Sequence, residues 1–287
     1  MSIEKIRTDL QKKIKLAQNA VPTREIARTA LDCLDYTSLK GDETPEIIRE
    51  FCDVALANRT ASVCIYPDKV AIARKVMDKS GQGDRAPDVA TVLNFPYGNL
   101  RTLSDEKATP ESTFADAKRM LADGANQIDI VMAYESFRDG DINYARELML
   151  AASDAIQDDA RFMVILETGT YYSVAKLREA CRNAYTCRAD FLKTSTGKHE
   201  SGGATLPAAA VLLDFAEGAG RPIGVKLSGG VKTHKDAAEF IELARSIRGM
   251  NSVRPDLFRI GASGVLDTLV SALSTNPIPP KEISPGY

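Results

Sequence analysis

The sequence predicts an α/β protein, a closed (β/α)₈ TIM barrel with extra N-terminal helices. Eight short apolar runs alternate with segments of helical periodicity over about 240 residues, which is the pattern of such a barrel. The runs are apolar throughout, as expected of parallel strands that are covered on both faces. The structural alternative is a doubly wound open sheet. That fold rarely needs eight units, and no GxGxxG motif follows the first run.

Two helices are expected before the first strand. Residues 3–19 place isoleucines and leucines at helical spacing among lysines and glutamines. Thr23 follows a proline and is a suitable N-cap for a second helix that runs to Ala30. Because both precede any strand, we expect them to pack over one end of the domain.

The eight strands and their helices follow from the alternation of the apolar runs with helix-start signals. The predicted strands are 31–35, 61–66, 88–95, 127–132, 162–167, the run that leads to Lys193, 222–227 and 257–260. The first predicted helix of the barrel runs from Pro45 to about 57, and the second follows Pro67. The third and fourth cover 104–123 and 143–155, and the fifth follows Ser173. The sixth begins near 206, the seventh covers 234–247, and the last ends near 273.

The chain shows no linker and no shift in composition, so we expect one domain over residues 1–287. Its parts would be the N-terminal helices in 1–30, the barrel in 31–274 and a C-terminal tail in 275–287. The length suits one large barrel domain.

Composition narrows the function. Apolar residues make up 44% and charged residues 26%, and the net charge of −2 gives no reason to expect a nucleic acid or an anionic membrane as partner. The start of the chain lacks the apolar segment of a secretion signal, so a cytoplasmic location is expected. Five cysteines without CxxC spacing and only two histidines predict neither a disulfide framework nor a metal site. We expect no cofactor.

The chemistry is expected at two lysines. Lys193 ends an apolar run that opens into small polar residues and a glycine, and Lys226 repeats this pattern. A lysine in an apolar pocket or beside a second cation loses its proton more readily and becomes a nucleophile toward carbonyls. The alternative is that both side chains reach solvent from strand ends. The doubled pattern favours the chemical interpretation.

Polar residues close the other runs. The carboxyl ends of barrel strands form the active face. The residues found there are Asp35, Thr37, Cys64, Asn94, Asp129, Glu167, Thr168, Lys193, Lys226 and Ser263. Asp129 lies within an apolar run and needs a cation as partner, since a buried carboxylate is costly alone. The alternative for Asp129 is a purely structural salt bridge.

Three glycine-containing loops close the last three strands, at 195–198, 228–230 and 261–264. Backbone N–H groups in such loops, together with the N-terminus of the helix after the last strand, form an anion cradle where barrels commonly bind phosphate. Glycines after single strands are often ordinary turns. Three on adjacent strands predict a phosphorylated substrate.

Several sequence motifs together resemble those of the deoxyribose-phosphate aldolases, a family of class I aldolases. They lie at 62–67, 91–96, 126–131, 167–169, 191–197 and 225–230. The resemblance runs from about residue 31 to 273 and implies a TIM barrel that works through a lysine Schiff base.

The resemblance implies roles for individual residues. Lys193 would form the Schiff base, Lys226 would lower its pKa, and Asp129 would relay protons. The substrate-binding residues would be Asp35, Thr37 and Cys64 in the pocket, and Thr196, Gly197, Lys198, Gly229, Gly230, Ser263 and Gly264 at the phosphate. Tyr287, the last residue, would help to move a proton if the tail reaches the site; otherwise it is a tail residue without that role.

Some positions depart from the family pattern. Leu227 stands in place of a small residue and is expected to narrow the pocket beside Lys226, Tyr97 replaces a histidine, and Gly264 replaces a serine. Residues 199–203 look like an insertion that acts as a lid over the phosphate.

The predicted function is the reversible cleavage of 2-deoxy-D-ribose 5-phosphate to glyceraldehyde 3-phosphate and acetaldehyde. A homo-oligomer, with a dimer as the first choice, is the expected assembly. Two alternatives stay open: a transaldolase-like or other Schiff-base aldolase with a longer donor, and a sugar-phosphate-binding barrel without turnover.

Overall fold

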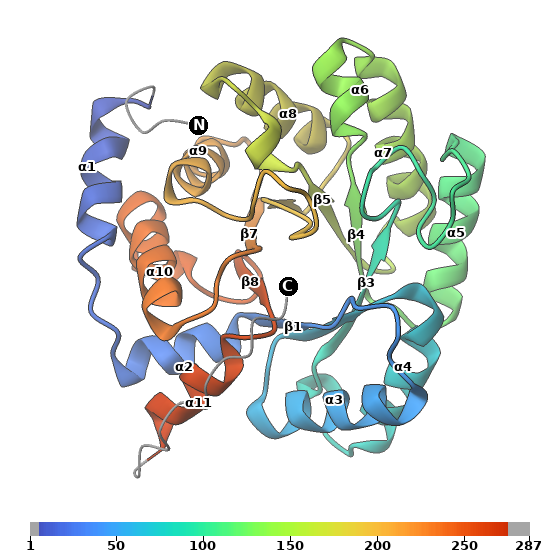
Figure 1. The fold of residues 1–287 in the computed structure, drawn as a ribbon, viewed down its shortest axis with the longest axis horizontal. Coiled ribbons are helices and arrows are strands. Elements are labelled where there is room, and N and C mark those ends of the chain that lie inside the picture. Colours follow the sequence, from blue (N-terminus) through green and yellow to red (C-terminus); the bar gives the residue numbers. More distant parts are fainter. Residues whose placement is uncertain (1–5, 275–287) are drawn as a thin grey trace.

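The computed structural model describes residues 6–274 and contains a closed barrel of eight parallel strands inside a ring of helices (Figure 1). Each strand pairs with the next in sequence, and β8 pairs with β1. The strands are β1 Leu34–Thr37, β2 Ser62–Ile65, β3 Asp88–Leu93, β4 Gln127–Val131, β5 Arg161–Ile165, β6 Phe191–Lys193, β7 Gly224–Ser228 and β8 Phe258–Ala262. The predicted (β/α)₈ barrel is confirmed.

The helices begin where the sequence supplies caps. Six of them follow a threonine or serine whose hydroxyl accepts a hydrogen bond from the backbone N–H three residues on. The helices are α1 Thr8–Ala17, α2 Arg24–Asp32, α3 Pro45–Asn58, α4 Val70–Lys79, α5 Pro110–Ala122, α6 Tyr134–Asp139, α7 Ile142–Ile156, α8 Val174–Thr186, α9 Leu206–Glu217, α10 His234–Arg248 and α11 Leu266–Leu273. Short 3₁₀ turns lie at η2 Pro67–Lys69, η3 Gly83–Arg85, η4 Thr168–Thr170 and η5 Met250–Ser252.

The first strand begins later than predicted. Helix α2 continues to Asp32 and β1 starts at Leu34, so the predicted start of the first strand at Leu31 is wrong by three residues. The buried residues of α2 are Ile26, Ala27, Ala30 and Leu31, which form a helical stripe toward the core. Leu31 therefore belongs to the helix.

The N-terminal helices do not both sit over an end of the barrel. Helix α1 packs against α10 and α9, on the outside of the helix ring (Figure 1). Lys235 fixes the segment after α1, since its Nζ donates to the carbonyl oxygens of Gln18 at 2.8 Å and Ala20 at 2.7 Å. Helix α2 packs against α10 and α11. The prediction that these helices cover one end is wrong for α1.

Two further helix predictions differ from the structure. The helix predicted over 104–123 begins only at Pro110, because Thr109 and Ser112 form a capping box there. Helix α6 was not predicted. It buries Tyr134 and Phe137 and ends at Gly140 in a left-handed conformation.

The strands separate apolar from charged side chains. Alternate residues of a strand point to opposite faces, and Ile128, Ile130, Val225 and Leu227 belong to the apolar core. Their neighbours in sequence therefore point into the barrel. Leu227 lies on the face opposite Lys226, so the prediction that it narrows the pocket is wrong.

All five cysteines are buried and free, as expected of reduced thiols in a core. Within residues 6–274, no helix is long and apolar enough to cross a membrane.

Candidate active site

Lys193 and Lys226 face each other inside the barrel. They are direct partners in the parallel register of β6 and β7. Side chains at matching positions of neighbouring strands point to the same face. Lys193 is 3% exposed and Lys226 is fully buried, so neither side chain reaches solvent as a surface lysine would. The predicted pairing of the two lysines is present.

Asp129 joins the two amines. Its Oδ2 accepts hydrogen bonds from Lys193 Nζ at 2.6 Å and from Lys226 Nζ at 2.8 Å. Its Oδ1 accepts a bond from Gln127 Nε2 at 3.1 Å. Burial alone would raise the pKa of Asp129, but the two ammonium groups outweigh it and the pKa lies below its ordinary value. Asp129 is therefore an ionised carboxylate that bridges the two lysine side chains.

Lys226 has a second carboxylate, Asp35. The two groups form a salt bridge, and Arg259 Nη1 lies 2.5 Å from the other oxygen of Asp35. Burial lowers the pKa of Lys226, but Asp129 and Asp35 outweigh burial and raise it above its ordinary value. For Asp35, burial is outweighed by Lys226 and Arg259, which hold its pKa well below the usual range. Lys226 is thus the permanently charged lysine of the pair.

Sequence reasoning missed Arg259 and Gln127. Arg259 is 2% exposed and stands within the apolar residues of β8. This is the same signal that singled out Asp129, a charge in an apolar run. Gln127 lies two residues before Asp129 on the same face of β4, and its Nε2 also donates to Asp35 Oδ2 at 3.0 Å.

The predicted pocket residues Thr37, the last residue of β1, and Cys64, one residue before the end of β2, are register partners. Thr37 is half-buried, and its hydroxyl donates to the carbonyl oxygen of Asp35 at 2.8 Å. Cys64 is buried, and burial raises the pKa of its thiol to about 11. At neutral pH it is therefore a neutral, apolar wall of the barrel, close to the charged cluster.

The glycine loops after β6 and β7 meet at backbone contact distance. A Cβ on Gly203 would lie 2.1 Å from the carbonyl carbon of Gly229, and a Cβ on Gly229 would lie 3.3 Å from the Cα of Gly197. Ala204 N donates to the carbonyl oxygens of Ser228 and Gly229, both at 2.9 Å. Only glycine permits this approach.

The other predicted phosphate residues lie around this crossing. Thr196 and Gly229 are partly exposed, whereas Gly197, Lys198, Gly230, Ser263 and Gly264 are exposed. Ser263 and Gly264 follow β8, which pairs with β7. The loops of three adjacent strands therefore present backbone groups and one lysine at the carboxyl end of the barrel.

Glu167 supports the loop after β6. Its backbone is left-handed, with φ of 53°. Its Oε2 accepts bonds from the backbone N–H of Thr196 at 3.0 Å and from the Thr196 hydroxyl at 2.6 Å. Burial raises the pKa of Glu167, against the opposing effect of the two Thr196 hydrogen bonds.

Residues 199–203 pack on the rest of this face. The imidazole of His199 lies edge-on to the ring of Tyr134, with 5.7 Å between centroids, and its Nδ1 is 2.8 Å from Ser201 Oγ. A Cβ on Gly169 would lie 2.4 Å from the same Oγ. The segment is held on the barrel in this structure, and movement as a lid stays a prediction.

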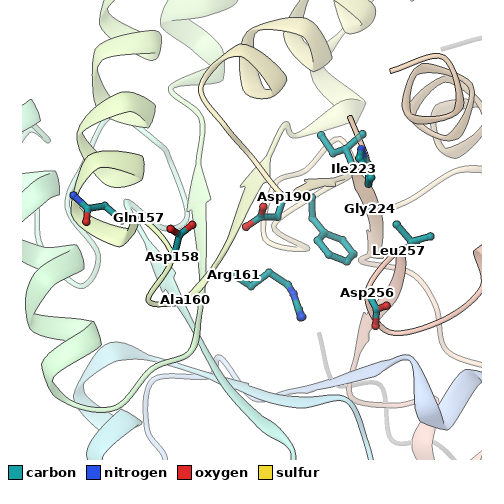
Figure 2. A pocket seen from close by; sticks show the side chains of 11 residues that line it. Gln157, Asp158, Ala160, Arg161, Asp190, Ile223, Gly224, Asp256 and Leu257 are labelled. Atoms are coloured by element: carbon teal, nitrogen blue, oxygen red, sulfur yellow. The ribbon is translucent and has the colours of Figure 1, made fainter. Parts of the chain in front are cut away.

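A separate cavity of 410 Å³ lies at the opposite end of the barrel (Figure 2). It is lined by the first residues of three strands, Arg161, Phe191 and Gly224. Lys193 and Lys226 lie further along β6 and β7 and do not line it. Tyr287, the predicted proton carrier of the tail, lies outside the described residues.

Comparison with known proteins shows the family of the chain. Residues 30–266 match the model of the DeoC/LacD family of aldolases. The chain is 37% identical over 266 residues to a deoxyribose-phosphate aldolase from Agrobacterium fabrum, covering 92% of this chain and 97% of the relative. Among solved structures it resembles an aldolase named QR15, with 25% identity, TM-score 0.65, and 84% and 96% of the two chains covered. A tetrameric deoxyribose-phosphate aldolase from Aeropyrum pernix shares the fold, with 21% identity, TM-score 0.70, and 90% and 96% covered.

Proposed function

The chain belongs to the DeoC/LacD family of aldolases, and we propose how its barrel cleaves 2-deoxy-D-ribose 5-phosphate to glyceraldehyde 3-phosphate and acetaldehyde. The observation that carries the proposal is the single oxygen of Asp129 shared by two buried lysine amines. This arrangement gives the two lysines different tasks.

Lys193 is the nucleophile. Lys226 pairs with two carboxylates, Asp129 and Asp35, and keeps its charge. Within residues 6–274, the only ion pair of Lys193 is with the shared oxygen of Asp129. The amine with fewer anionic partners gives up its proton at lower cost, and a second cation nearby favours that loss. Lys226 therefore supplies the positive charge beside the reacting amine.

The reaction proceeds through an imine. Lys193 Nζ attacks the C1 aldehyde of the open-chain sugar, and loss of water leaves a protonated imine. The C2–C3 bond then breaks, because acetaldehyde carries two of the five carbons. Its electron pair forms the C1–C2 double bond of an enamine, the C3 hydroxyl loses its proton, and glyceraldehyde 3-phosphate leaves. Protonation at C2 and hydrolysis release acetaldehyde and restore the amine.

Asp129 is placed to move protons in these steps. Its carboxylate lies at hydrogen-bond distance from Lys193 Nζ. This nitrogen bonds to the substrate carbon when the carbinolamine forms, and it remains bonded when the carbinolamine loses water. Lys226, bound to the same oxygen, keeps Asp129 ionised so that its carboxylate can accept a proton. Asp35 is better explained as the counter-ion of Lys226, while Thr37 and Cys64 line the pocket next to it.

The phosphate binds where the glycine loops meet. The loops after β6, β7 and β8 offer unshielded backbone groups, and Lys198 adds a positive charge at the exposed rim. This anchor would hold the sugar by its far end with the aldehyde over Lys193. Thr196, tied to Glu167, fixes the position of the first of these loops.

Three expectations go beyond the site. We keep the predictions of a single domain, of a cytoplasmic location and of a homo-oligomer, for which the tetrameric Aeropyrum pernix enzyme gives a precedent. Light scattering of the purified chain measures its assembly: a mass of two or more chains agrees with the last prediction, and a monomer contradicts it.

A donor assay tests the substrate. The protein is incubated with 2-deoxy-D-ribose 5-phosphate, and both products are measured by coupled dehydrogenases. Borohydride reduction with acetaldehyde should leave an ethyl group on the protein. An adduct formed from dihydroxyacetone instead would indicate an aldolase with a longer donor, and binding without products would indicate a sugar-phosphate-binding barrel.

A further inference from the structure

Arg259 is buried in the barrel but touches neither reacting lysine. Its Nη1 lies 2.5 Å from Asp35 Oδ1, its Nε donates to the carbonyl oxygen of Pro255 at 2.6 Å, and its Nη2 lies 3.4 Å from Asp88 Oδ2. Burial of a guanidinium is costly, and it is stable only where carboxylates offset the lost hydration. The arginine is therefore held in the barrel by two acids.

These contacts extend into a chain of alternating charges along the barrel interior. Asp88 also faces Arg161, at 3.7 Å, whose side chain points into the cavity at the far end of the barrel (Figure 2). From that end the order is Arg161, Asp88, Arg259, Asp35, Lys226, Asp129 and Lys193. Every member is an ion-pair neighbour of the next.

Counting the charges shows what Arg259 does. The buried part of the chain, from Arg259 to Lys193, has two carboxylates and, besides Lys193, two cations. It is neutral with Lys193 as a free amine and carries one positive charge with Lys193 protonated. Without Arg259, the same chain would be neutral only with Lys193 protonated. In a buried cluster, the neutral state is strongly preferred.

Other charged and titratable groups also face Lys193 and its partners. The groups near Lys193 are Asp129 on β4, Lys226 on β7, Cys64 on β2 and Glu167 after β5. Asp35 on β1 lies near Lys226. Cys33 and Asp88 lie near Arg259. Arg259 is the cation that balances Asp35, because Lys226 is shared with Asp129.

We propose that Arg259 is a positioning residue of the aldolase reaction: by neutralising Asp35 it leaves Lys226 to Asp129 and allows Lys193 to stand as the free amine. This inference rests on the proposed function, since it concerns the proton on the Schiff-base lysine. It acts through Asp35 and Lys226 and involves no contact with substrate.

The test compares the pH dependence of kcat/KM for cleavage in the wild type, Arg259→Met and Arg259→Lys, with Arg161→Met as matched control. Arg161→Met removes the same charge from the remote, partly exposed end of the chain. For Arg259→Met we expect the acid limb of the kcat/KM profile, the low-pH side on which activity falls, to move to higher pH by about one unit or more. Activity near pH 7 should then fall about tenfold or more and recover in alkali. Arg259→Lys should restore the wild-type limb, and Arg161→Met should leave it in place.

The outcomes separate the two proposals. Cleavage and reductive trapping of the wild type test the proposed function by themselves, and their failure would remove that function first. With the wild type active, a loss in Arg259→Met that is the same at every pH would show a merely structural role and overturn the inference. If Arg259→Met does not fold, Arg259→Lys decides: a wild-type acid limb supports the proposal, and a displaced limb contradicts it.

Discussion

Lys193 and Lys226 are opposite one another on adjacent strands, and their amines bond to the same oxygen of Asp129. One carboxylate oxygen thus connects two buried lysine amines inside the barrel. The difference between the lysines lies in their other partners, since only Lys226 also contacts Asp35.

Lys226→Leu should retain the fold and lose most activity. Each carboxylate keeps one cation, Asp35 with Arg259 and Asp129 with Lys193, so no buried charge is left alone. Asp129 then holds Lys193 as an ammonium, and kcat should fall by about 100-fold or more. Circular dichroism checks the fold and steady-state kinetics the rate. A rate near that of the wild type would remove Lys226 from the mechanism.

Gly261→Ala should disturb Lys226 from the neighbouring strand. A Cβ at this position would lie 3.1 Å from Lys226 Cε and 3.0 Å from Ser228 Cβ. Such crowding in a packed interior costs about 1–3 kcal/mol and shifts side chains. We expect kcat to fall about tenfold, with little change in KM. Gly218→Ala is the control, because its nearest neighbour lies 3.7 Å away. Equal kinetics in both variants would contradict the account.

Gly203→Ala should weaken phosphate binding in particular. Its Cβ would lie 2.1 Å from the carbonyl group of Gly229, so the loop after β7 must move. KM for 2-deoxy-D-ribose 5-phosphate should rise about tenfold or more, whereas kcat/KM for unphosphorylated 2-deoxyribose should change little. The unphosphorylated sugar is the internal control. Equal losses with both sugars would show that these loops do not form the phosphate site.

Glu167→Gln should stabilise the protein in alkali and not in acid. Burial raises the pKa of Glu167 above its ordinary value of 4.5, against the opposing Thr196 bonds, so the folded state prefers the neutral acid. This preference adds its full contribution to the free energy of unfolding below the pKa that Glu167 has in the unfolded state. The contribution is lost as the pH rises through the pKa of Glu167 in the folded state. Glutamine keeps an oxygen for Thr196 without the charge. Thermal unfolding at about pH 4 and about pH 8 measures the difference. A gain of equal size at both pH values would contradict this explanation.

The sequence was most informative where a charge interrupts an apolar run. Lys193, Lys226 and Asp129 were predicted for this reason, and the barrel register brings them together. Arg259 carries the same signal, but its partner Asp35 is 224 positions away in the chain. Only the closure of β8 on β1 shows that the two meet.

Other differences come from packing that local patterns do not contain. Leu31 is apolar and precedes a strand, yet it completes the buried stripe of α2. The place of α1 depends on contacts with α10, far along the chain. Glu167 was recognised as a strand end, but its hold on Thr196 depends on the loop after β6.

Mapping the trapped lysine tests the central claim most directly. Wild type, Lys193→Ala and Lys226→Leu are treated with 2-deoxy-D-ribose 5-phosphate and borohydride, digested and analysed by mass spectrometry. The account predicts an ethyl group on Lys193 in the wild type, the same site with lower yield in Lys226→Leu, and no adduct in Lys193→Ala. An adduct on Lys226 or another lysine in the wild type would contradict it.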